Sequence, residues 1–307
     1  MDIIKKNTSL LTFVLLLSAS MAAQQLPQFT QYMYNTVAIN PAYAGSREAL
    51  SIVALHRSQW NGFNGGPKTL TVSANSPLRN DKIGVGMSFI RDELGYERFS
   101  YLYGDFSYTI RTGENTELAF GLKAGFTHYE LDNDLLSDPS IINDPYFNNI
   151  SNHWSPNMGL GIYWHSNKWY MGLSSPRIFT TDYNKEEEFE ASERIGYYLT
   201  GGYVFTLSKD IKFKPAFLIK ATNGSSMAYD FTGNFLFYEK MWIGAAYRVD
   251  DAAAVLIDFQ VTPQWRIGYT YEQPISDIRP YTSGTHEILL MFELKFNNAK
   301  YKSPRYF

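Results

Sequence analysis

The sequence predicts an all-β fold: a transmembrane antiparallel β-barrel of about 14 strands, with short periplasmic turns and long extracellular loops. Three observations favour this fold. Polar and apolar residues alternate along much of the chain, and the connections between the alternating runs are short and long in turn. Aromatic residues make up 16% of the chain, with 23 Tyr and 21 Phe. Such a content is typical of barrels that carry aromatic girdles at both membrane interfaces.

The first 23 residues have the pattern of a secretory signal peptide. Lys5 and Lys6 supply a positive start, residues 10–17 an apolar core, and Ala22 or Ala23 a small residue for cleavage. The apolar core is too short to cross a bilayer, and no later run has the length of a transmembrane helix. The chain has no cysteine. Disulfides, a lipoprotein anchor and thiolate chemistry are therefore excluded.

The period-two pattern is clearest toward the C-terminus, in residues 264–272 and 286–296. Aromatic and aliphatic side chains alternate there with polar, charged or small ones, as in a strand with one apolar face. Soluble sandwiches also alternate, but these runs have the length that a tilted membrane strand requires. The alternation predicts strands at 49–57, 68–76, 82–91, 98–111, 116–128, 155–165, 168–175, 194–207, 211–222, 226–238, 241–249, 252–262, 264–273 and 285–297.

The connections between these strands alternate in length. The even connections are all short, and they lie near residues 77–81, 112–115, 166–167, 208–210, 239–240 and 263. The odd connections include all the long ones, which are 58–67, 129–154, 176–193 and 274–284. Bacterial barrels have short periplasmic turns and longer external loops, whereas a soluble sandwich has no reason to sort its loops in this way.

The chain therefore divides into three parts: a signal peptide (1–23), a periplasmic N-terminal segment or plug (24–48) and the outer-membrane barrel (49–307). The middle part is polar and aromatic and ends in the sequence NPAYAG, residues 40–45. We expect it to lie in the periplasm or to fold into the mouth of the barrel. The formal charge of −3 argues against a nucleic-acid surface, which should be strongly basic.

The sequence offers little for catalysis. None of the five histidines has metal-ligand spacing, and no G-x-S-x-G nucleophile elbow occurs. The Gly-x-Gly pairs at 84–86 and 159–161 lie within predicted strands, where glycine permits a bend or close packing and does not bind a nucleotide. We therefore expect no enzyme activity, no cofactor and no metal. Inward-facing charges of both signs, among them Lys123, Glu272 and Glu287, argue against a selective porin. Pro215 lies on the lipid face of a predicted strand and indicates either a bulge there or that the strand is wrongly assigned.

Several short motifs of the chain are characteristic of one family. They are Gln28–Asn35, Asn40–Gly45, His56–Trp60, Gly65–Thr69, Ser155–Gly161, Tyr170–Ser174, Gly284–Ile288 and Ser303–Phe307. Through these residues the chain resembles the PorP/SprF family of outer-membrane proteins of the type IX secretion system in Bacteroidetes, from about residue 25 to the C-terminus. The block from Gln28 to Gly45, followed by His56–Trp60, is the most specific part.

The resemblance implies an integral outer-membrane protein, after signal-peptide cleavage, that supports secretion or surface attachment of cargo with a C-terminal sorting domain. It also implies a link to gliding motility in some members. The implied partners are periplasmic ring or peptidoglycan-binding components, a cargo adhesin and outer-membrane lipid, with no nucleic acid. A passive pore or small-molecule transporter is the alternative. Aromatic side chains dominate binding hot spots. The candidate partner-binding residues are Tyr32, Tyr34, Asn40, Pro41, Tyr43, Arg57, Trp60 and Phe63, and packing within a plug or rim explains the aromatic ones equally well.

Overall fold

The computed structural model describes residues 28–295, except 133–134, 136–152, 183–191 and 224. The predicted signal peptide lies outside the described residues, as do parts of the predicted loops 129–154 and 176–193. No helix in the described part of the chain is long and apolar enough to cross a membrane.

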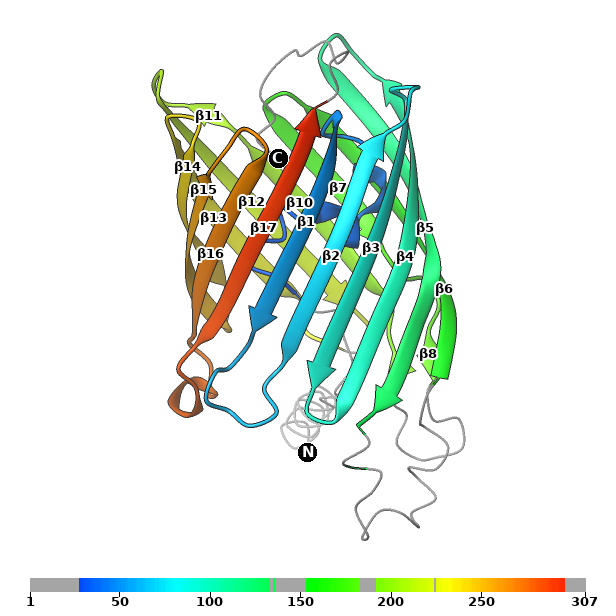
Figure 1. The fold of residues 1–307 in the computed structure, drawn as a ribbon, viewed down its shortest axis with the longest axis vertical. Helices are drawn as coiled ribbons and strands as arrows, with labels where there is room; N and C mark the ends of the chain where they lie inside the picture. The colour runs from blue at the N-terminus through cyan, green and yellow to red at the C-terminus, as the bar shows by residue number, and fades with distance from the viewer. Residues whose placement is uncertain (1–27, 133–134, 136–152, 183–191, 224, 296–307) are drawn as a thin grey trace, which may run out of the picture.

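Fourteen long strands form one closed antiparallel barrel (Figure 1). Consecutive long strands pair along the sheet, and β1 also pairs with β17, which closes the barrel. The long strands are β1 (Ala49–Ser58), β2 (Lys68–Pro77), β3 (Ile83–Leu94), β4 (Glu97–Arg111), β5 (Thr116–Leu131), β6 (His153–Ser166), β7 (Trp169–Ser175), β10 (Gly196–Tyr203), β12 (Ile211–Thr222), β13 (Ala228–Phe237), β14 (Met241–Arg248), β15 (Ala252–Gln260), β16 (Trp265–Pro274) and β17 (Thr285–Lys295). The predicted barrel of fourteen strands is confirmed.

The strand predicted at 194–207 is interrupted. It consists of β10 and the two-residue β11 (Phe205–Thr206), and both pair with β12. The gap lies opposite Pro215, since the β10 ladder stops at Gly202–Ala216 and the β11 ladder begins at Phe205–Phe213. Proline has no N–H to donate to a ladder. β12 itself is continuous, so Pro215 breaks its neighbour and not its own strand. A second small sheet, β8 (Thr181–Asp182) with β9 (Ser192–Glu193), lies where only a loop was predicted.

The two rims of the barrel differ. One rim carries the connections β1–β2, β7–β10 and β16–β17, which include long loops, and the other carries the short connections such as β2–β3 and β4–β5 (Figure 1). We call these the long-loop rim and the short-turn rim. Both the start of β1 and the end of β17 lie at the short-turn rim, as an even number of strands requires.

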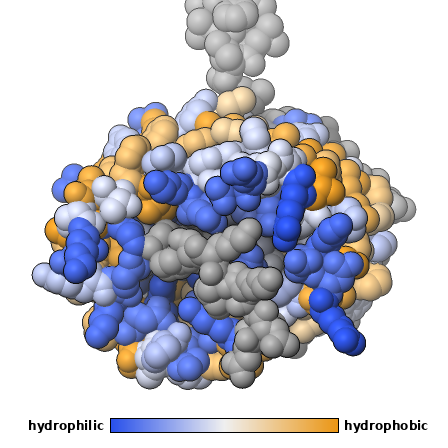
Figure 2. Space-filling view, turned by 90° about the horizontal axis from the view of Figure 1, so that it is seen from above, coloured by the Kyte–Doolittle hydropathy of each residue, from blue (hydrophilic) through white to orange (hydrophobic). Residues whose placement is uncertain are grey.

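Side chains alternate between the lumen and the outer surface of the wall. On β4, Tyr101, Tyr103 and Asp105 are buried, whereas Leu102 and Phe106 are exposed on the outside. Seen from the short-turn rim, hydrophilic residues surround the mouth and hydrophobic residues lie around the circumference (Figure 2). A closed wall of this kind satisfies its backbone hydrogen bonds internally and offers lipid only apolar side chains.

The lumen is occupied by the chain's own N-terminal segment, which appears in blue inside the barrel in Figure 1. Residues 29–44 are all buried. They include a single helical turn, α2 (Thr36–Ile39), and a 3-10 turn, η1 (Pro41–Tyr43). Segment residues share hydrophobic clusters with the wall: Met33 with Leu289 and Met291, for example. We call residues 28–48 the lumenal segment.

Candidate functional site in the barrel lumen

The lumenal segment is held near the long-loop rim by a cluster of buried charges. The Glu287 carboxylate on β17 accepts hydrogen bonds from the backbone N–H of Thr30 at 2.8 Å and of Gln31 at 3.1 Å. The Thr30 hydroxyl donates to Glu272 on β16 at 2.6 Å. Two wall carboxylates therefore recognise the backbone and one side chain of the segment.

Arg57 on β1 neutralises both carboxylates. Its Nη2 lies 2.7 Å from Glu272 Oε1, and its Nη1 forms an ion pair with Glu287. The Arg57 side chain is only 2% exposed. Arg248 on β14 extends the cluster, since it lies 2.9 Å from Asp230 Oδ1 and 3.6 Å from Glu272 Oε2. A buried charge requires such partners, because leaving it unpaired away from water is costly.

The middle of the segment makes polar contacts on two sides of the lumen. The Tyr34 hydroxyl donates to Asp258 on β15 at 3.0 Å, and Arg266 on β16 lies over the Tyr34 ring at 5.3 Å. On the other side, the Asn35 amide donates to Thr71 on β2 at 3.1 Å and accepts from Ser73 at 2.7 Å. The segment is thus fixed to strands on both sides of the β1–β17 seam.

Wall side chains donate to backbone carbonyls in the second half of the segment. Lys123 Nζ on β5 donates to the Val37 carbonyl at 3.2 Å and lies 2.6 Å from Asp105 Oδ1 on β4. The hydroxyls of Ser174 and Ser107 donate to the carbonyls of Ile39 and Ala44, at 2.8 and 2.7 Å. The Asn40 side chain donates in turn to the Ile162 carbonyl of β6 at 3.0 Å.

Glycines in the wall make room for this part of the segment. A Cβ added to Gly121 on β5 would lie 2.1 Å from the Ala42 nitrogen. A Cβ on Gly84 of β3 would lie 2.0 Å from the Ala44 oxygen, and one on Gly161 of β6 would lie 2.1 Å from Asn40 Oδ1. These separations are too short for any side chain. The Gly-x-Gly pairs of the sequence therefore belong partly to the surface that receives the segment.

The structure places the candidate partner-binding residues in two different environments. Six are buried in the lumen: Tyr32, Tyr34, Asn40, Pro41, Tyr43 and Arg57. Tyr43 packs edge-on against Tyr163 of the wall at 5.3 Å between ring centroids. Contact of a partner with these six side chains would require the segment to leave the barrel.

The other two, Trp60 and Phe63, lie in the β1–β2 connection at the long-loop rim, in edge contact at 6.4 Å. Trp60 is partly buried and has a φ of 54°, which is unfavourable for a residue with a side chain. Phe63 is 46% exposed. The backbone N–H of Asn61 between them donates to the Gly284 carbonyl of the β16–β17 connection at 2.8 Å, so the two loops are tied together.

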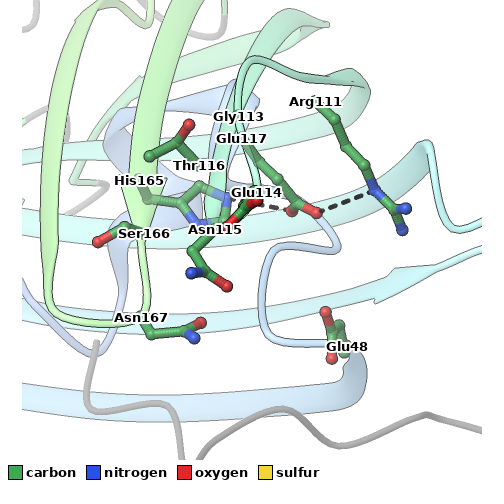
Figure 3. A pocket seen from close by; sticks show the side chains of 10 residues that line it. All are labelled: Glu48, Arg111, Gly113, Glu114, Asn115, Thr116, Glu117, His165, Ser166 and Asn167. Atoms are coloured by element: carbon green, nitrogen blue, oxygen red, sulfur yellow. Dashed lines mark ion pairs between the residues drawn. The ribbon is translucent and has the colours of Figure 1, made fainter.

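A polar pocket lies at the short-turn rim, between the β4–β5 and β6–β7 turns (Figure 3). Glu117 lies 3.8 Å from Arg111 Nε and 3.9 Å from His165 Nε2. Arg111 is 69% exposed, so this pair contributes little to stability. The pocket mixes acidic, basic and amide groups, and Glu48 also lines it. Within the described residues, no group of three or more His, Cys, Asp or Glu side chains could hold a metal ion.

Sequence reasoning identified inward-facing charges but not the contacts they make. Glu272, Glu287 and Lys123 were among those expected to face the lumen, and all three are buried there. Their role in holding residues 30–37 was not predicted. Two features of the sequence could have indicated these contacts. The N-terminal segment is polar and aromatic, and the predicted strands carry charged side chains on their inward faces.

Comparison with known proteins gives a family match and several distant structural matches. A family model described as "Type IX secretion system membrane protein PorP/SprF" matches residues 21–292. No curated protein sequence matches the chain. Among solved structures, the outer membrane protein Omp33 of Acinetobacter baumannii is 11% identical over 81% of this chain and 100% of its own, with a TM-score of 0.44. The Ralstonia pickettii toluene transporter TbuX is 10% identical over 90% of this chain and 96% of its own, with a TM-score of 0.48.

Proposed function

Because the chain belongs to the PorP/SprF family of type IX secretion system membrane proteins, we propose that it acts as a non-enzymatic outer-membrane component of that system. In this proposal it supports secretion or surface attachment of cargo that carries a C-terminal sorting domain. A contribution to gliding motility, as in some family members, is part of the same proposal.

The observation that carries the proposal is the family match over residues 21–292, most of the chain. The occupied lumen supports it. The wall and the segment share the Arg47–Glu293 ion pair and main-chain hydrogen bonds, so the protein itself occupies the interior. A barrel of this kind offers its partners mainly its rims, and a protein that works through its rims fits a component of a larger assembly better than a passive pore does.

Each rim has a suitable surface for a different partner. The polar pocket at the short-turn rim faces the periplasm in the usual barrel orientation, where ring or peptidoglycan-binding components would contact it. Trp60 and Phe63 at the opposite rim belong to the loops that would hold cargo. Phe63 is exposed on a loop that is hydrogen-bonded to the neighbouring β16–β17 connection. Such a residue is a suitable binding hot spot, because the loop loses little conformational freedom when a partner binds.

The test is affinity purification from detergent-solubilised outer membranes, with mass spectrometry of the proteins recovered. We would place the tag in the β16–β17 connection, beside the exposed Asp277, so that the lumenal segment stays intact. An unrelated outer-membrane barrel with the same tag is the control. Recovery of periplasmic secretion components or one large adhesin supports the proposal.

Recovery of the barrel alone, under conditions that keep other outer-membrane complexes intact, would contradict it. Export of cargo should also fail in a deletion strain. Normal export in that strain, together with ion conductance of the purified protein in planar bilayers, would favour the passive pore instead.

A further inference from the structure

We infer that the lumenal segment crosses the barrel from the extracellular mouth to the periplasmic rim, so that its N-terminal end opens on the cell exterior. The inference concerns the path of residues 28–48 and does not depend on the proposed role in secretion. It reverses the simplest expectation for residues that directly follow a signal peptide and precede the first strand, which is that they remain in the periplasm.

The contacts of residues 28–31 place the start of the segment at the long-loop rim. Gln28 donates to Asp230, the third residue of β13, which follows the β12–β13 connection. Thr30 contacts Glu287, the third residue of β17, and Glu272, two residues before the end of β16. Both glutamates adjoin the 275–284 connection between these strands.

The contacts of residues 44–47 place the end of the segment at the opposite rim. The Gly45 N–H donates to Asn75 at 3.2 Å, two residues before the end of β2, and the Ala44 carbonyl accepts from Ser107, near the end of β4. Arg47 forms an ion pair with Glu293, near the end of β17. β1 then begins at Ala49 and runs back toward the long-loop rim.

The intervening contacts follow the same order. Asn35 bonds side chains in the middle of β2, and Val37 meets Lys123 at the middle of β5. The longer Tyr34 side chain reaches Asp258, two residues before the end of β15. The segment therefore makes one continuous passage and does not fold back as a hairpin.

Loop length assigns the two rims to compartments. Bacterial barrels carry short turns on the periplasmic side and their longer loops outside. Here the short turns, such as the β4–β5 turn, lie at the rim where the segment ends, and the long connections lie at the rim where it begins. The outer mouth of the barrel is thus lined in part by the partly buried Gln28, and residues 29–31 are buried directly behind it.

The test is the accessibility of an epitope in intact cells. One variant carries a short epitope with flexible flanks directly before Gln28. Two matched controls carry the same epitope beside Asp277, in the β16–β17 connection, and beside Asn80, in the β2–β3 turn; both residues are exposed. Heat-modifiable mobility on gels establishes that each barrel is folded. We expect antibody to bind the N-terminal and Asp277 epitopes on intact cells, and the Asn80 epitope only after permeabilisation.

Binding of the N-terminal epitope only after permeabilisation, or only after denaturation, would overturn the inference.

A pair of cysteine substitutions tests the passage of the segment through the lumen without an insertion. The chain has no cysteine, and a Cβ on Gly86 of β3 would lie 3.0 Å from a methyl group of Val37. The double variant Val37→Cys/Gly86→Cys should form a disulfide on oxidation, whereas Val37→Cys/Gly104→Cys, with Gly104 on the outer face, should not. Absence of the first crosslink in a folded barrel would also contradict the inference. Neither readout depends on secretion, so its result is separable from that of the proposed function.

Discussion

Arg57 on β1 and Glu287 on β17 are cross-strand neighbours at the seam that closes the barrel, and their side chains form an ion pair inside the lumen. The same Glu287 carboxylate accepts two backbone hydrogen bonds from the lumenal segment. A single residue therefore joins the closing seam of the wall to the chain that fills the interior.

Replacing Arg57 by methionine should destabilise the barrel strongly. The substitution leaves Glu272 and Glu287 buried without their shared cation, and breaking a buried pair in this way typically costs about 3–5 kcal/mol. Urea-induced unfolding of the refolded barrel in lipid vesicles measures the effect. Arg111→Met, at the exposed rim, is the matched control and should change stability by less than about 1 kcal/mol. Equal effects of the two substitutions would contradict a stabilising role for the cluster.

Gly121→Ala should displace the lumenal segment. The new methyl group would lie 2.1 Å from the Ala42 nitrogen, so backbone must move, and overpacking of this kind costs about 1–3 kcal/mol. We expect faster proteolysis within residues 28–48 of the folded barrel. Gly104→Ala is the control, because the nearest atom to its Cβ lies 3.9 Å away. If the segment resists proteolysis equally in both variants, the absence of a side chain at Gly121 is not needed to accommodate it.

The mature barrel should conduct ions poorly in planar bilayers, and deletion of residues 29–44 should raise its conductance. Those residues fill the lumen, and their removal leaves a cavity lined by charged and polar side chains. Single-channel recording measures the difference, with folding checked by heat-modifiable mobility. Should the deletion variant fail to fold, Gly121→Ala serves in its place. High conductance of the unaltered protein would show that the segment does not seal the barrel.

Phe63→Ala should weaken recovery of partner proteins without affecting the barrel. Truncation of an aromatic hot spot typically costs at least about 2 kcal/mol of binding, and Phe63 is exposed and makes no contribution to the lumen. Quantitative mass spectrometry of co-purified proteins gives the readout. Leu78→Ala is the control for an external partner, since Leu78 is equally exposed, at 47% against 46%, but lies at the opposite rim. Unchanged recovery from the Phe63 variant would remove this residue from the proposed surface.

Much of the wall could be predicted from sequence because each strand shows its two environments in its own residues. On β4, the apolar Leu102 is exposed on the outer surface and the polar Asp105 is buried in the lumen, so the polarity of each residue indicates the side it faces. The break opposite Pro215 was only half predictable. Proline indicates a lost hydrogen bond, but which neighbouring strand loses it depends on which side of the strand its N–H would have faced.

The lumen was harder to predict. Tyr34 and Tyr43 look alike in sequence whether they bind a partner or fill a barrel, since burial against protein gives aromatic residues the same advantage in both cases. The contacts of Glu287 depend on residues 257 positions away in the chain, and no local pattern contains that information. The wall glycines were assigned to close packing from sequence, but their neighbour, the segment itself, follows only from the three-dimensional path.

The occupied lumen bears on the order of events in assembly. The lumenal segment contacts strands from both halves of the wall, including β1, β5, β13 and β17, and wall glycines fit closely around its backbone. Glu287 on the last strand, β17, pairs with Arg57 on β1 and also accepts from the start of the segment, so these contacts need the closed seam. Contacts so distant in sequence are slow to form, so we expect closure of the barrel and placement of the segment to be one late, slow step of assembly.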